Sequence, residues 1–256
     1  MSVAAESPRW RAAARLVPLV ALLLTAACGG GSGGDEPPIT LYVSVAGNDG
    51  NTGESPEAPL RTIRAAVIRA RGGDTIIVGP GTHRPPAETP GIVVDIVAFT
   101  ATASRPLRIE ADAAGDLLGE PPGEVVLDAA GGPFAVRLSG SAGIVLDGFV
   151  VTGARGNNAA GIQVRSGSSD IVVRNAEIRA NDGDGVRIEA SDRTLLFNNL
   201  IRDNALRGIQ VSGGGLGTEG TELVANTVAG NGNDGISVGG GTIRDTFLRN
   251  NLVVHT

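Results

Sequence analysis

Short runs in which apolar and polar residues alternate dominate the second half of the chain, and four of them share one form. A glycine followed by an aliphatic, a polar and a second aliphatic residue recurs at Gly161, Gly185, Gly208 and Gly235, at spacings of 24, 23 and 27 residues. Alternation places both aliphatic side chains on one face of a strand. The spacing is typical of stacked repeats, so the pattern predicts one such strand per repeat, lying on its counterpart in the next.

Asparagine and aliphatic residues recur at fixed distances before these glycines. An asparagine stands four residues before each glycine: Asn157, Asn181, Asn204 and Asn231. Seven residues before the last three glycines stands an aliphatic residue: Ile178, Ile201 and Val228. A second asparagine lies nine or ten residues before them: Asn175, Asn198 and Asn226. We expect the asparagines to hydrogen-bond from one repeat to the next, which satisfies polar groups buried at the turns.

Glycines and β-branched residues interrupt every window of ten in this region, which excludes helices of useful length. Short strands joined by tight turns remain, and their stacking predicts an all-β parallel β-helix. The polar residues of the four strands are expected to line its outside: Gln163, Arg187, Gln210 and Ser237. Leucine-rich repeats and calcium-binding nonapeptide solenoids are the alternatives, but neither spacing occurs here.

Helical spacing appears once, between Leu60 and Arg71. Leu60, Ile63, Val67 and Ala70 fall on one side, and Gly72-Gly73 follows. Such a helix would cap one end of the coil and keep its bore dry. The preceding segment, 48–53, superficially resembles a calcium loop but lacks the spacing of one, and is interpreted as a turn.

The first 27 residues have the form of an export signal, in which three arginines precede an apolar run too short to span a bilayer, Leu16–Ala27. Small residues then lead to Cys28, the only cysteine, and the whole resembles a bacterial lipoprotein signal. That resemblance implies a lipidated Cys28 and an extracytoplasmic, membrane-anchored protein on the outer membrane or cell surface. The alternative is an ordinary secretory cleavage site. Residues 28–40, rich in glycine and proline, would form a tether.

The formal charge of the chain is −6, and without the expected signal 18 arginines face 26 acidic residues, a balance of −8. Nucleic acid is therefore not an expected partner, because phosphate contacts need concentrated positive charge. Lysine is absent from the chain.

The segment from Leu41 to Thr82 carries a family resemblance in its Tyr-Val-Ser, Ser-Pro, Pro-Leu-Arg-Thr-Ile, Gly-Asp-Thr-Ile and Gly-Pro-Gly-Thr runs. It resembles the opening module of right-handed β-helix proteins of the pectate-lyase-like superfamily. The resemblance implies a right-handed coil in one domain, 41–256, with a cap module at 41–86 and regular coils at 137–256. It implies lyases and other carbohydrate-active proteins as relatives.

Catalytic candidates are few. Polysaccharide lyases neutralise a carboxylate, commonly with calcium, and use lysine or arginine as base. Without lysine, Arg187 is the candidate base, beside Arg165 and Glu189 on outward positions. The alternative interpretation pairs Arg165 with Glu189 as a surface ion pair. His83 is interpreted as a packing residue.

Calcium ligands could come from Asp182, Asp184 and Asp203, although aspartate before glycine is also ordinary turn chemistry. A polysaccharide or another cell-surface partner could be bound by Gln163, Arg187, Glu189 and Gln210. Three phenylalanines, Phe149, Phe197 and Phe247, are expected to pack inside the coil, which leaves few aromatic faces for sugars.

Two functions follow: a surface-anchored β-helix that binds a polysaccharide without catalysis, or a calcium-dependent polysaccharide lyase of the pectate type. The repeat is still running at Val253, with no capping segment after it. We therefore expect another chain or a missing segment to cover the open carboxy-terminal end.

Overall fold

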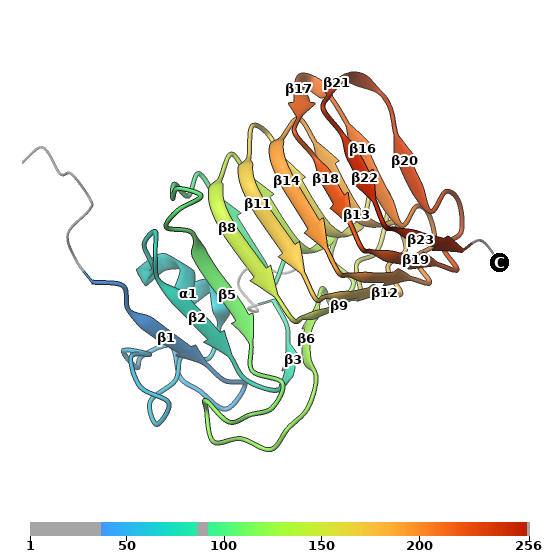
Figure 1. The fold of residues 1–256 in the computed structure, drawn as a ribbon. Coiled ribbons are helices and arrows are strands. Elements are labelled where there is room, and N and C mark those ends of the chain that lie inside the picture. Colours follow the sequence, from blue (N-terminus) through green and yellow to red (C-terminus); the bar gives the residue numbers. More distant parts are fainter. Residues whose placement is uncertain (1–36, 86–91, 255–256) are drawn as a thin grey trace, which may run out of the picture. The chain divides into compact units, whose positions relative to one another are not determined.

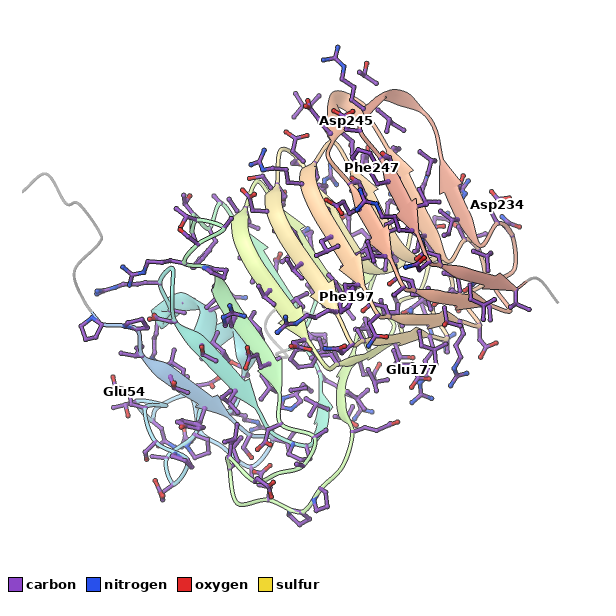
Figure 2. The ribbon with its side chains drawn as sticks, viewed as in Figure 1. Glu54, Glu177, Phe197, Asp234, Asp245 and Phe247 are labelled. Atoms are coloured by element: carbon purple, nitrogen blue, oxygen red, sulfur yellow. The ribbon has the colours of Figure 1, made fainter. Side chains whose placement is uncertain are left out.

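The computed structural model describes residues 37–85 and 92–254, which hold 23 strands and one short helix. All strand pairs of its sheets are parallel, and from β2 onward consecutive strands belong to different sheets (Figure 1). Each sheet is therefore assembled from strands one coil apart, as the repeat predicts. Apolar side chains fill the space between the three large sheets (Figure 2).

The first sheet has eight strands: β1 (Thr40–Val43), β2 (Thr75–Val78), β5 (Leu107–Ala111), β8 (Ala142–Asp147), β11 (Ser169–Arg174), β14 (Asp192–Phe197), β18 (Glu222–Val224) and β22 (Phe247–Arg249). The second has six: β4 (Val94–Val97), β7 (Phe134–Ser139), β10 (Ala160–Arg165), β13 (Asp184–Glu189), β16 (Ile209–Ser212) and β20 (Ile236–Val238). The third has seven: β3 (Gly81–His83), β6 (Val125–Asp128), β9 (Val150–Thr152), β12 (Glu177–Arg179), β15 (Leu200–Arg202), β19 (Thr227–Ala229) and β23 (Leu252–Val254). Two further strands pair with each other: β17 (Gly214–Glu219) and β21 (Gly241–Arg244).

The aliphatic residues of the glycine-containing strands form ladders inside the coil. One ladder runs through Ile162, Val186, Ile209 and Ile236, which are successive register partners. The first three are no more than 1% exposed. This confirms that these strands stack in register, each burying its aliphatic face on the next.

The predicted cap helix is α1 (Ile63–Arg69), which buries Ile63 and Ala66 and packs against β1, β2 and β4. Thr62 caps its amino end by accepting a hydrogen bond from the Ala65 amide. The turn at 48–53 holds this cap in place, because the Asp49 carboxylate accepts from the Arg61 and Thr62 amides, both at 2.8 Å. The turn interpretation of that segment is therefore confirmed.

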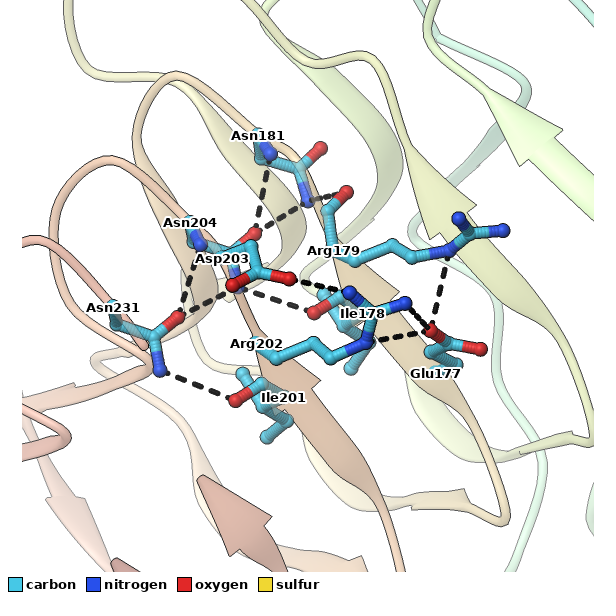
Figure 3. A network of polar contacts seen from close by, with 9 residues as sticks. All are labelled: Glu177, Ile178, Arg179, Asn181, Ile201, Arg202, Asp203, Asn204 and Asn231. Carbon is cyan, nitrogen blue, oxygen red and sulfur yellow. Dashed lines mark hydrogen bonds and ion pairs between the residues drawn. The ribbon is translucent and has the colours of Figure 1, made fainter. Parts of the chain in front are cut away.

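Buried asparagines form a ladder at the corner between the third and second sheets (Figure 3). Asn181 Nδ2 donates to Asn204 Oδ1 at 2.9 Å, and Asn204 Nδ2 donates to Asn231 Oδ1 at 3.0 Å. The same Oδ1 atoms also accept from the backbone amide of the preceding asparagine. Each amide thus has its partner one coil away, and all three side chains are at most 5% exposed.

The repeating glycines are explained by this ladder. A Cβ at Gly161 would lie 2.7 Å from Asn181 Nδ2, and one at Gly185 would lie 2.8 Å from Asn204 Nδ2. Neither glycine has a positive φ. Close approach of the asparagine on the next coil, rather than backbone freedom, therefore excludes a side chain at these positions.

One expected ladder position, Asn157, is wrong: it is exposed, and Ala154 takes its place by donating its amide to Asn181 Oδ1 at 3.0 Å. Asn198 Nδ2 donates to Asn175 Oδ1 at 2.8 Å, which confirms the bond expected between these coils, although it lies at the surface. The buried second ladder runs one residue later, through Asn199, Asn226 and Asn251. Asn198 occupies a left-handed corner with φ 55°, a conformation that asparagine tolerates better than most residues.

We expect Asn204→Ala to lower the free energy of unfolding by about 2 kcal/mol, because it leaves buried amides on both neighbouring coils without partners. Chemical denaturation of this variant, of a control variant and of the parent chain would measure the change in the free energy of unfolding. Asn233→Ala is the control, since Asn233 is exposed and donates its backbone amide, which alanine keeps, to the Leu206 carbonyl. Equal effects of the two substitutions would contradict the importance of the ladder.

Candidate functional site

A continuous column of polar side chains crosses the outer face of the six-stranded sheet. We call it the polar column, and its members are successive register partners: Asp95, Arg137, Gln163, Arg187, Gln210 and Ser237. Each lies between two inward-facing aliphatic positions of its strand, so alternation directs it away from the bore. The column brings together three of the four residues predicted to bind a ligand: Gln163, Arg187 and Gln210.

Arg187 is buried in this column rather than open to solvent, at 6% exposed. Its Nε and Nη2 both donate to Asp184 Oδ2, at 2.9 and 2.6 Å, and Nε also reaches Gln210 Oε1 at 3.2 Å. Nη1 donates to the carbonyl of Asn158 at 2.9 Å and to its side-chain oxygen. The turn before β10 therefore folds over the arginine, which the strand pattern does not reveal.

This arrangement suits a structural cation. The Asp184 carboxylate is fully buried and also accepts from the Arg207 amide at 3.2 Å. The Arg187 guanidinium donates to a buried carboxylate and to oxygens of Asn158 and Gln210, whereas a catalytic base needs a nitrogen that is free to reach the substrate. The candidate base Arg187 is thus placed among partners that oppose that role.

Gln163 lies between Arg137 and Arg187 and is fully buried, although the sequence predicts an outward, exposed position. Neither its Nε2 nor its Oε1 has a hydrogen-bond partner among the described residues. Arg137 is engaged elsewhere, because its Nε and Nη2 donate to Asp95 at 2.9 and 2.7 Å. A buried amide without hydrogen-bond partners lowers the free energy of unfolding, so Gln163 destabilises this part of the column.

The remaining outward candidates lie at the edge of the same face. Arg165 and Glu189 are register partners, as expected, but no ion pair joins these two described residues. Arg165 Nε donates to Ser166 Oγ at 3.0 Å. Gln210 and Ser237 are half-buried, as are Asp95 and Arg137, so the column is most deeply buried in its middle, at Gln163 and Arg187.

The candidate calcium ligands are not brought together. Asp184 faces Arg187, Asp182 pairs with Arg155 at 3.5 Å, and the Asp203 carboxylate pairs with Arg202. Among the described residues, no three histidine, cysteine or acidic side chains are grouped as a metal site. Calcium takes six to eight oxygen ligands, so these arginine-paired carboxylates do not fit it.

His83 is 5% exposed, in agreement with a packing role, and its Nε2 lies 3.0 Å from the carbonyl of Gly79. Burial lowers the pKa of His83, while the Gly79 carbonyl and the charge of Glu120 oppose that shift. Glu120 also accepts a hydrogen bond from Ser44, which ties the loop after β5 to β1.

Two of the three phenylalanines expected in the core lie on the surface. Phe149 is buried at 2% exposed, as predicted. Phe197 and Phe247 are 41% and 43% exposed on the outer face of the eight-stranded sheet (Figure 2). In both strands the phenylalanine occupies a position whose side chain points outward. Without neighbouring positions to compare, a single phenylalanine in a short strand does not reveal which face it is on.

The last described coil leaves inward positions open. Leu248 and Val253 are 49% and 48% exposed, although their register partners, Leu223 and Val228, are fully buried. That another chain or a further segment covers these positions stays a prediction.

Cys28 and His255 lie outside the described residues. Within 37–85 and 92–254, no helix has the length and apolarity needed to cross a membrane.

We expect Arg187→Leu to lower the free energy of unfolding by about 3 kcal/mol, because it removes the nearer of the two guanidinium groups that face the buried Asp184 carboxylate and leaves Arg207, at 3.5 Å. Denaturant unfolding measures the change, and Asp184→Asn in the same background should recover part of it. Arg165→Leu, on the neighbouring rung of the same sheet, is the matched control and should cost less than about 1 kcal/mol. A small effect of Arg187→Leu would contradict the structural assignment.

The lowered pKa of His83 predicts a pH dependence of stability. The unfolded chain takes up the proton first as the pH falls, so the contribution is complete above about pH 6.5 and is lost progressively below it. His83→Gln keeps a donor for Gly79 and does not titrate. Its free energy of unfolding should change less between pH 7.5 and 5.5 than that of the parent chain, as followed by denaturation at both pH values.

The chain matches two family models. Residues 130–256 match a family described as a right-handed beta helix region, and residues 45–97 match a family described as a protein of unknown function, DUF1565. Among curated proteins, no sequence matches the chain significantly.

Solved structures share its fold at low sequence identity. The chain is similar to pectate lyase Pel9A, with 19% identity and a TM-score of 0.63 over 78% of this chain and 50% of that one. A rhamnogalacturonan lyase gives 14% identity and 0.62 over 84% and 68%, and an alginate lyase from Paenibacillus sp. str. FPU-7 gives 19% and 0.51 over 84% and 76%. The chain thus spans half the length of pectate lyase Pel9A. Taken with the stacked parallel sheets, these matches show that the chain is a right-handed parallel β-helix of the pectate-lyase-like kind.

Proposed function

We propose that this protein binds a polysaccharide along the polar column, outside the cytoplasm, without catalysing a reaction on it. The observation that carries the proposal is the column itself, in which six successive rungs present polar side chains on one face. Rungs repeat every 4.8 Å or so, a spacing comparable to the size of a sugar ring. An extended glycan lying along the coil axis would meet a hydrogen-bonding side chain at each rung where the column is accessible, as at Gln210 and Ser237.

The later rungs are the proposed contact region. Gln210 and Ser237 are half-buried, and Glu189 stands at the edge of the same face. Their amide, hydroxyl and carboxylate groups match the hydroxyl groups of a sugar. Gln163 and Arg187 are buried, Arg187 beneath the turn that contains Asn158, and both would support the site rather than touch the glycan directly.

A non-catalytic role is favoured by the state of the candidate residues. Arg187 is bound to Asp184, lysine is absent from the sequence, and the described carboxylates form no metal cluster. The alternative is a calcium-dependent polysaccharide lyase. It is favoured by the names of the structural neighbours, a pectate, a rhamnogalacturonan and an alginate lyase, although their identity to this chain is below 20%.

The location rests on the sequence. The apolar run before Cys28 and the glycine-rich segment after it resemble a lipoprotein signal with its tether. A lipid on Cys28 would hold the coil at a bacterial membrane, where surface polysaccharide is available as a ligand. Mass spectrometry of the protein from its host would show the lipid on Cys28 or, if the site is an ordinary secretory one, an unmodified mature chain.

Affinity electrophoresis in gels containing polygalacturonate, rhamnogalacturonan or alginate tests the binding. We expect at least one of these acidic glycans to retard the chain, and the double variant Gln210→Ala/Ser237→Ala to weaken binding about fivefold to thirtyfold, as the loss of two hydrogen bonds implies. Thr227→Ala, on the outer face of the seven-stranded sheet, is the control. Equal retardation of the parent chain, the double variant and Thr227→Ala would show that the polar column does not bind the glycan.

The same glycans decide between binding and catalysis. Lyase action creates an unsaturated product that absorbs in the ultraviolet, so absorbance is followed with calcium and again after chelation. The proposal expects no increase in either condition. A calcium-dependent increase that chelation abolishes would establish the lyase alternative.

A further inference from the structure

The outer face of the eight-stranded sheet carries an apolar patch on five successive strands, from β8 to β22. Its members are Val145, Val172, Leu195, Phe197, Val224 and Phe247. Val145 is covered, Val172, Leu195 and Val224 are half-buried, and Phe197 and Phe247 are more than 40% exposed. Contiguous exposed apolar surface of this kind marks interaction sites in soluble proteins.

Opposite charges stand at the two ends of this patch. At one end, Asp147 on β8 and Arg174 on β11 form an ion pair at 2.7 Å. At the other end, Glu222 on β18 and Arg249 on β22 have no ion pair with another described residue. Arg249 instead lies over the Phe247 ring, with its guanidinium carbon 5.3 Å from the ring centroid.

The order of these charges is self-complementary. Leu195 and Phe197 lie on β14, the middle of the five strands, and the two ends are each two strands away. A twofold axis through β14 and parallel to the strands places β8 against β22 of a second copy, and β11 against β18. Asp147 then faces Arg249 of the second copy, and Arg174 lies diagonally opposite its Glu222.

The same axis brings apolar positions together: Phe197 and Leu195 meet their own counterparts at the centre, and Val145 lies opposite Phe247 of the second copy. It also places Arg174 opposite Val224 and Glu222 opposite Val172. A twofold axis along the coil would instead place all four charged residues opposite apolar ones, with Asp147 against Val145, Arg174 against Val172, Glu222 against Val224 and Arg249 against Phe247. The arrangement with inverted strand order therefore places fewer charges against apolar side chains.

We propose that two copies of this chain associate through the apolar patch, with their eight-stranded sheets face to face and their coils in opposite directions. Large apolar side chains, aromatic ones above all, contribute most to such interfaces. The polar column lies on another sheet, so this association leaves the proposed glycan site of each copy accessible and does not depend on it.

Sedimentation velocity of the full chain at micromolar concentrations tests the association. We expect a dimer that Phe197→Glu converts into a monomer. Leu216→Glu is the matched control, because Leu216 is 78% exposed on β17 and lies outside the patch. Circular dichroism of each variant confirms that the β-fold is intact.

A charge-exchange experiment tests the strand order. Asp147→Arg/Arg174→Asp keeps an ion pair within the chain but reverses one end of the patch, and Glu222→Arg/Arg249→Glu reverses the other. Each double variant alone would place like charges together, so we expect at least a tenfold weaker dimer. Mixed in equal amounts, the two variants restore every opposite-charge contact and should form a heterodimer.

Three results would overturn the proposal. One is a parent chain that stays monomeric up to about 100 μM, a concentration at which even a weak dimer forms. Another is a dimer that survives Phe197→Glu, which would mean that a different face associates. The third is loss of glycan binding by Phe197→Glu without any change in sedimentation, which would assign the patch to the glycan.

Discussion

In-register stacking of the coils is the constraint on which the rest of this structure depends. Each residue lies between its counterparts on the coils before and after it, about 4.8 Å away. An aliphatic position therefore contributes a continuous apolar wall, as Ile162, Val186 and Ile209 do. A buried polar position must find its partner in the next coil, and asparagine meets that need because its side chain both donates and accepts. Three of the repeating glycines, Gly161, Gly185 and Gly208, are set by the same contact, since the next asparagine approaches the space of a Cβ.

This constraint also decides what the sequence can predict. Gly-aliphatic-polar-aliphatic runs and spaced asparagines reveal the coil, the inner wall and the Asn181 ladder, because all of these are properties of the repeat. The error at Asn157 has a physical origin: the ladder site needs a backbone amide to approach Asn181, and Ala154 supplies it from an irregular turn. The shift from Asn198 to Asn199 arises because adjacent asparagines serve two roles, a left-handed corner and a ladder position, which composition does not separate.

The candidate site was less predictable, because it depends on contacts between turns and strands. Alternation places Gln163 and Arg187 outside the bore correctly, but exposure depends on what covers them. The carbonyl of Asn158 and the carboxylate of Asp184 surround the Arg187 guanidinium, and neither contact follows from strand spacing. For Phe197 the sequence does not show which residues of its short strand point inward and which point outward. Register with Arg174 and Val224 fixes that phase in the structure and turns the ring outward.

The outer faces of the coil differ because the bore constrains only every second residue of a strand. The six-stranded sheet has a polar column, whereas the eight-stranded sheet carries aliphatic and aromatic side chains on the corresponding outward positions. Neither choice affects the inner ladders, so each face is free to serve a separate contact. Along the polar column, burial is deepest at Gln163 and Arg187, and the turn that contains Asn158 covers Arg187. The turn before β10 thus decides that Arg187 is closed to a ligand, although strand alternation directs it outward.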